Sequence, residues 1–129
     1  MTNQGIAALI AAVVLGGLIV FQVLLALGVP WGKAAWGGQH PGALPANLRW
    51  GSAAAAVVLG FAMWMVLARA GWVAPGSDAL WVKIVTWIFT AYFAFNVVMN
   101  VLSTSAIEKA IMTPASAILV IGLVLVSLL

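Results

Sequence analysis

Four long apolar runs dominate this sequence, and each is long enough to cross a lipid bilayer. They cover residues 6–28, 51–69, 79–102 and 106–129, and a spanning helix needs about 20 mostly apolar residues. Inside hydrocarbon, every backbone N–H and C=O must be satisfied within the chain, which restricts spanning segments to helices and closed barrels. The runs lack the alternation of polar and apolar residues typical of barrel strands. The expected fold is therefore an all-α, four-helix transmembrane bundle, with residues 1–129 as a single domain.

The composition excludes most classes of soluble protein. Of the 129 residues, 66% are hydrophobic and 5% are charged, whereas a soluble domain is about 45–50% apolar and about 25% charged. A small domain leaves roughly a third of its extended-chain surface exposed, so a water-soluble fold could not cover this much apolar surface. The net charge of +3 comes from isolated cations. Isolated cations of this kind favour the anionic headgroups of membrane lipids as partners. Binding of nucleic acid needs a clustered basic face and is not expected.

Local signals mark the expected helix ends. Ser105 and Glu108 have the spacing of a capping box, in which the serine caps the fourth helix and the glutamate reaches back to the serine N–H. The turn at 75–78 predicts an N-cap at Asp78 ahead of the third helix. Pro114 lies inside the fourth helix and is expected to kink it.

The connection 29–50 is the most unusual segment, and we expect it to form an ordered cap along the membrane surface. Its glycine-rich turns would expose backbone N–H groups that can bind anions, and two of the five cations add positive charge. The candidate residues for a lipid headgroup or another anion are Lys33, Trp36, His40 and Arg49. The alternative is an interfacial loop anchored by tryptophan, whose cations merely extend toward water.

A second candidate site is a stripe of polar side chains in the apolar runs. Asn96 and Asn100 are four residues apart and therefore share one face of the third helix. Such groups usually form interhelical hydrogen bonds worth about 0.6 kcal/mol each, and the functional alternative is a polar cavity for a small solute or an ion. Proton-coupled transport usually needs a carboxylate or histidine within the membrane, and none is expected there. The candidate residues are Gln22, Thr86, Thr90, Tyr92, Asn96, Asn100, Thr113 and Ser116.

Small residues recur every four positions on the first two predicted helices. This spacing lets helix backbones approach closely in lipid. It predicts packing within one bundle or contact with another membrane helix, from a second copy or a partner subunit. The candidate positions are Ala8, Ala12 and Gly16 on the first helix and Ser52, Ala56 and Gly60 on the second.

No catalytic, cofactor or metal site can be assembled from these residue types. The chain has no cysteine, one histidine and two acids, so thiolate chemistry, Ser-His-acid sets and paired carboxylates are excluded. We therefore expect a non-enzymatic membrane protein that acts by association, as an accessory subunit or a homo-oligomer. The alternatives are a small-solute transporter or channel that uses the polar stripe, and the binding of a lipid or another apolar small molecule.

Two motifs resemble a group of small bacterial membrane proteins. The first begins at residue 30 and reads PWGKAAWGGQH, followed by LP at 44–45 and LR at 48–49. It resembles the first loop of uncharacterised bacterial proteins with four transmembrane helices. The second motif, residues 96–114, contains EK at 108–109 and MTP at 112–114, and is similar to the last connection of those proteins. The resemblance implies the four-helix layout and a bacterial plasma membrane, and assigns no activity or functional residue.

Overall fold

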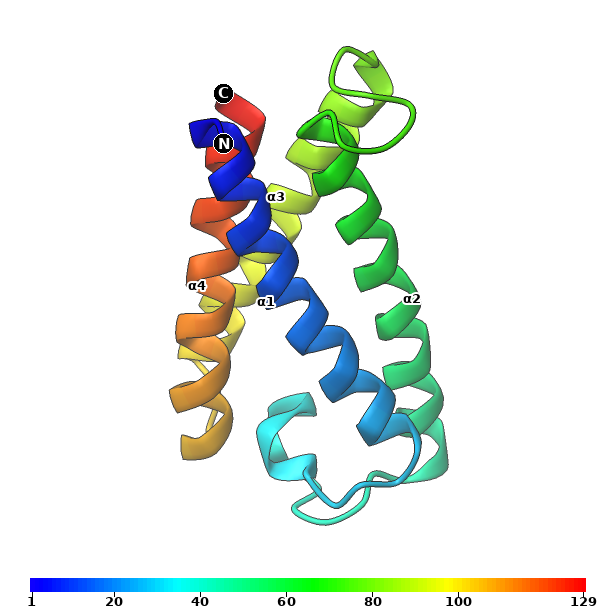
Figure 1. Cartoon of the computed structure of the whole chain (residues 1–129). Helices are drawn as coiled ribbons and strands as arrows, with labels where there is room; N and C mark the ends of the chain where they lie inside the picture. The colour runs from blue at the N-terminus through cyan, green and yellow to red at the C-terminus, as the bar shows by residue number, and fades with distance from the viewer.

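The computed structural model describes all 129 residues, which form four antiparallel helices and no strand (Figure 1). The helices are α1 (Asn3–Ala26), α2 (Ala46–Arg69), α3 (Leu80–Val101) and α4 (Ala106–Leu128), and two short 3-10 turns, η1 (Gly32–Ala34) and η2 (Trp36–Gly38), lie in the first loop. Both termini and the α2–α3 linker lie at one end of the bundle, here called the terminal end. The first loop and the short α3–α4 connection lie at the opposite end, the loop end.

All four helices are long and apolar enough to cross a membrane. Only 27 of the 129 residues are buried within the chain, and large apolar side chains are exposed along every helix. Such a surface is suited to lipid and not to water. The expected class, an all-α integral membrane four-helix bundle, is confirmed.

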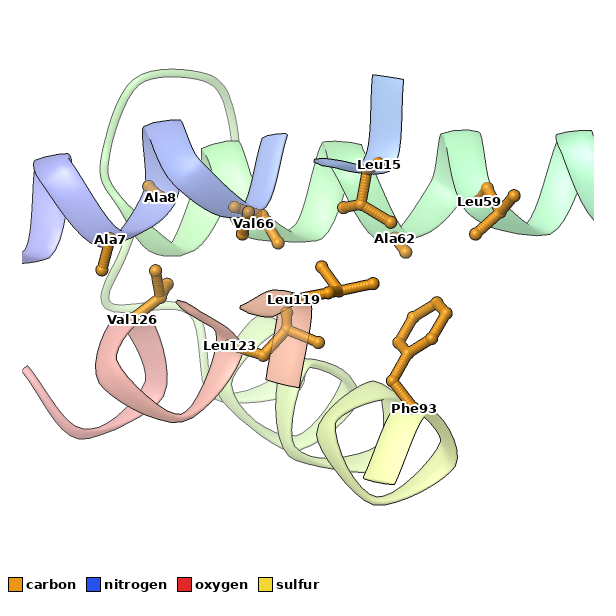
Figure 2. Close-up of a cluster of buried hydrophobic side chains, with 11 residues drawn as sticks. Ala7, Ala8, Leu15, Leu59, Ala62, Val66, Phe93, Leu119, Leu123 and Val126 are labelled. Carbon is orange, nitrogen blue, oxygen red and sulfur yellow. The ribbon is translucent and has the colours of Figure 1, made fainter. Parts of the chain in front are cut away.

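The main core lies in the terminal half of the bundle, where α1 packs between α2 and α4 (Figure 2). Leu15, Leu119 and Leu123 are completely buried there. The core cluster consists of Ala7, Ala8, Ala11, Leu15, Leu59, Ala62, Val66, Phe93, Leu119, Leu123 and Val126. α3 packs mainly on α4 and contacts α2 much less. The terminal half is therefore filled with side chains, and α2 and α3 are the loosest neighbouring pair.

Close approach of α1 and α4 depends on Gly122. A Cβ atom on Gly122 would lie 3.1 Å from the Cβ of Ala11 and 3.3 Å from the carbonyl oxygen of Ala7. The two glycines expected from the sequence are less tightly packed: a Cβ on Gly16 would lie 3.6 Å from the Met63 side chain, and one on Gly60 would meet nothing within 4 Å. Gly122 was not among the predicted positions, whereas Ala8 and Ser52, which were, are completely buried.

Polar side chains at the terminal end satisfy backbone carbonyl groups. Arg69 donates from Nη2 to the carbonyl oxygen of Ser127 at 3.2 Å, and Gln4 donates from Nε2 to that of Val126 at 3.0 Å. Both acceptors lie in the last turn of α4, whose carbonyls have no partner inside the helix. A cation is also favoured at this negative end of the helix dipole. These contacts tie α1 and α2 to the end of α4.

Several predicted helix ends need correction. α2 begins at Ala46 and not at residue 51, because Pro45 has the extended conformation of an N-cap and the five residues that follow are already helical. The loop 29–50 was therefore predicted too long at its far end. The N-cap of α3 is Ala79 and not Asp78, which lies one residue too early in the turn. α4 continues as one helix through Pro114.

We expect Gly122→Leu to lower the free energy of unfolding by about 1–3 kcal/mol, the usual cost of overpacking a filled interior. The matched control is Gly17→Leu, because a Cβ on Gly17 meets nothing within 4 Å. Unfolding of both variants in detergent micelles provides the measurement. Equal stability of the two variants would show that the α1–α4 contact is not close-packed at Gly122.

Candidate functional site

The first loop is folded back onto the bundle by three consecutive residues with positive φ. Trp36, Gly37 and Gly38 have φ angles of 52°, 74° and 72°. Glycine adopts this left-handed conformation freely, whereas a residue with a side chain pays roughly 1–2 kcal/mol for it. A Cβ on Gly38 would also lie only 2.3 Å from the Cβ of Ser105. Glycine is therefore required at Gly38 by both its conformation and its contact with the start of α4.

Side-chain hydrogen bonds hold this loop against two helices. Trp36 donates from Nε1 to Ser52 Oγ on α2 at 3.0 Å. On α4, Glu108 accepts a hydrogen bond from the Gly37 N–H through Oε2 at 3.1 Å. Ser105, the N-cap residue of α4, donates from Oγ to the carbonyl oxygen of Lys33. The loop is thus bound at its centre to both sides of the bundle.

The capping box predicted at α4 is only half formed. Ser105 Oγ does accept from the Glu108 N–H, at 3.2 Å. The reciprocal bond is absent, because the Glu108 carboxylate binds Gly37 and the Ser105 N–H is taken by Ser103 Oγ at 3.2 Å. Glu108 therefore links α4 to the loop, 71 residues away in the sequence, and no local signal could have predicted that partner.

A cavity of about 540 Å³ lies under the loop, between the four helices. Its apolar wall includes Leu18, Phe21, Val58, Leu59, Phe93 and Met99. Its polar lining includes Gln22, Gln39, Tyr92, Asn96, Asn100, Ser103, Thr104, Glu108 and Ser116, together with the Trp36 indole. No lysine, arginine or histidine lines it. The volume lies within the range of about 300–1,000 Å³ found for small-molecule sites.

Two hydrogen-bond acceptors in this lining are not fully used by the protein. Gln22 Oε1 is buried and has no hydrogen-bond partner. Glu108 is only 7% exposed, and its one hydrogen-bond partner as an acceptor is the Gly37 N–H, at Oε2. In contrast, Asn100 is engaged, because its Nδ2 donates to Ser116 Oγ at 3.1 Å and to the Met112 carbonyl at 3.3 Å. Buried acceptors without partners are rare in folded proteins, and Gln22 Oε1 is the one that lies in this lining. Glu108 adds a carboxylate that accepts only one hydrogen bond from the protein.

The structure divides the predicted polar stripe into two parts. The members that line the cavity are Gln22, Tyr92, Asn96, Asn100 and Ser116. Thr86 does not, because its Oγ1 donates to the Val82 carbonyl of its own helix at 2.7 Å. Thr90 similarly donates to the Thr86 carbonyl at 2.8 Å, and Thr113 Oγ1 is buried without a partner. The stripe therefore contributes five residues to the candidate site, and its three threonines lie outside it.

The predicted loop residues are also separated. Trp36 lines the cavity, whereas Arg49 donates from Nε to the Ala26 carbonyl at 3.0 Å and so caps the end of α1. Arg49 and Trp50 line a second cavity of about 400 Å³. Lys33 is exposed and His40 is half-buried. The structure does not bring the two loop cations into one pocket.

No family model, curated protein or solved structure matches this chain. No group of three or more histidine, cysteine or acidic side chains is placed to hold a metal ion. What the cavity offers chemically is apolar surface, aromatic rings, and hydrogen-bond donors and acceptors, which are the elements of a binding site.

We expect the Trp36–Ser52 hydrogen bond to stabilise the loop by about 0.5–1.5 kcal/mol, the net value of a typical intramolecular hydrogen bond. A double-mutant cycle of Trp36→Phe and Ser52→Ala, read by unfolding, should give a coupling energy of that size. Trp50→Phe is the control, because Trp50 is 78% exposed and its replacement should not couple to Ser52. Purely additive effects at positions 36 and 52 would contradict the bond.

Proposed function

We propose that this membrane protein binds a small amphipathic molecule in the cavity under the first loop. The observation that carries the proposal is the composition of the cavity lining. Most of the lining residues are apolar, and hydrogen-bonding side chains from the helices and the loop lie among them. A pocket with a mostly apolar wall and a few convergent polar groups is the usual form of a small-molecule site.

The position of the cavity favours entry from the lipid side. Val58 on α2 and Tyr92 and Met99 on α3 line the cavity and are 44%, 52% and 50% exposed. They lie on the two helices that pack together most loosely among chain neighbours. An amphipathic molecule already dissolved in the bilayer could therefore enter between α2 and α3, with its polar group directed to the loop end.

Transport, the alternative based on the polar stripe, has less support. The cluster around Leu15, Leu119 and Leu123 fills the terminal half, and Thr86 and Thr90 bond within their own helix. A polar path through the bundle would need that core to open. Flux of a solute through liposomes that depends on Asn96 would support transport over binding alone.

We expect Ala55→Phe to reduce ligand occupancy by about tenfold, because Ala55 lines the cavity and an added ring would displace part of the ligand. A tenfold change in affinity corresponds to about 1.4 kcal/mol. This is less than the free energy of about 1.5–3 kcal/mol gained when an apolar group the size of a large side chain is buried. Native mass spectrometry of protein extracted from its host membrane should show a bound molecule that this variant has lost. Ala54→Phe is the control, because Ala54 is exposed and lies outside the cavity. Equal occupancy in both variants would contradict the proposed site.

Association with another membrane helix is a second candidate function, favoured by Gly60. This glycine is exposed on α2, and a Cβ there would meet nothing within 4 Å, so a further helix has room to approach. The partner would be a second copy or a larger subunit to which this chain is accessory. The resemblance of the loop motif to bacterial proteins supports the bacterial inner membrane as the location.

We expect Gly60→Leu to dissociate such an assembly without unfolding the bundle, because close backbone approach needs a small residue. Single-molecule photobleaching or cross-linking in native membranes measures the assembly size. Gly17→Leu, another change at an open glycine, tests whether the effect is specific to α2. An unchanged assembly size for Gly60→Leu would exclude this interface.

A further inference from the structure

We infer that the molecule held in this cavity carries a positively charged nitrogen and that Glu108 is its counter-ion. The inference rests on the proposed function, since it names the chemical class of the ligand for the same cavity. Glu108 is one of only two acids in the chain, and it is 7% exposed at the edge of the apolar lining.

The surroundings of Glu108 leave its negative charge without a partner. Its only hydrogen-bond donor is the neutral N–H of Gly37, and no cationic side chain lines the cavity. Lys109 follows it in the sequence but is exposed and lies outside the lining. A carboxylate can accept several further hydrogen bonds, and a bond from a cationic donor is about twice as strong as one from a neutral donor. A cation brought by the ligand would supply the missing charge.

The rest of the cavity suits an organic cation with N–H groups. Gln22 Oε1 is a second acceptor in the same lining and is buried without a donor. Trp36, Tyr92 and Phe93 supply aromatic rings, whose faces attract ammonium and guanidinium groups. The apolar wall favours a hydrocarbon or aromatic body over a bare metal ion. An amphipathic amine combines these features, with its nitrogen toward Glu108.

A purely structural role for Glu108 makes a different prediction. The hydrogen bond from the Gly37 N–H needs only an acceptor oxygen, charged or neutral. A glutamine at position 108 keeps an acceptor oxygen and removes the charge. Glu108→Gln therefore separates the two roles: the loop contact can survive in this variant, and the selectivity for a cation cannot.

The experiment compares 4-phenylbutylamine with 4-phenylbutanol, which have the same carbon skeleton and differ in charge. Binding to the full chain in nanodiscs of zwitterionic lipid is measured by calorimetry, with empty nanodiscs subtracted. We expect the amine to bind at least about tenfold more tightly than the alcohol, as for a hydrogen bond to a charged group. Glu108→Gln should remove this preference. The control, Asp78→Asn, removes one negative charge from the exposed α2–α3 linker, and it should leave the preference for the amine unchanged.

Equal affinity for the two probes, or an amine preference that survives in Glu108→Gln, would overturn the inference. The proposal that the cavity is a binding site would still stand if Ala55→Phe weakened the binding of both probes. If neither probe binds the wild-type protein, or if Ala55→Phe changes the affinity of neither probe, the cavity itself is not the binding site and both proposals fail.

A second test applies if Glu108→Gln loosens the loop, as seen by hydrogen exchange at Gly37. The variant for this test is Gln22→Leu. It removes the other free acceptor without touching the loop bonds and should reduce the amine preference in the same direction.

Discussion

The contact between the first loop and the start of α4 determines the shape of the functional half of this molecule. Glu108 and Ser105 lie in or next to the first turn of α4 and bind the backbone of Gly37 and Lys33. A loop in a largely apolar protein has few polar partners, and each backbone group kept from water needs one. The loop satisfies part of that requirement on α4, and in doing so it contributes Ala34, Trp36 and Gln39 to the cavity lining.

The same contact explains why the two halves of the bundle differ. In the terminal half, Gly122 and the alanines of α1 allow close packing, and large side chains fill the remaining space. At the loop end, η1 and η2 lie between α4 and the ends of α1 and α2 (Figure 1). They occupy the place that helix–helix packing takes in the other half. The cavity therefore lies at the end of the bundle where a folded loop, and not direct contact between helices, fills the space between α4 and its neighbours.

The helices could be predicted from the sequence because length and hydropathy alone determine what can span a bilayer. The N-cap at Ser105 was also predictable, since its signal lies within four residues. The partner of Glu108 was not, because Gly37 is far away in the sequence and nothing local distinguishes it. Five of the eight stripe residues lie in one lining, and two of them, Asn96 and Asn100, could be grouped from the sequence because they share a helix face. Thr86 failed because a threonine can satisfy itself on its own helix, which sequence periodicity does not reveal.

Glu108 lies in the first turn of α4, where the helix stabilises a charged carboxylate but does not pair it with a cation. The N-terminus of a helix carries a partial positive charge that favours a nearby anion, by about 0.3–1 kcal/mol at exposed sites. The Gly37 N–H is the only hydrogen-bond donor to this carboxylate, so Glu108 keeps further acceptor capacity for a ligand. The helix end and the Gly37 N–H are formally neutral groups, and neither cancels the formal charge of the carboxylate that lines the cavity. On the proposed function, an amphiphile of any charge gains from the walls and the neutral polar groups, whereas a cationic one gains in addition from Glu108.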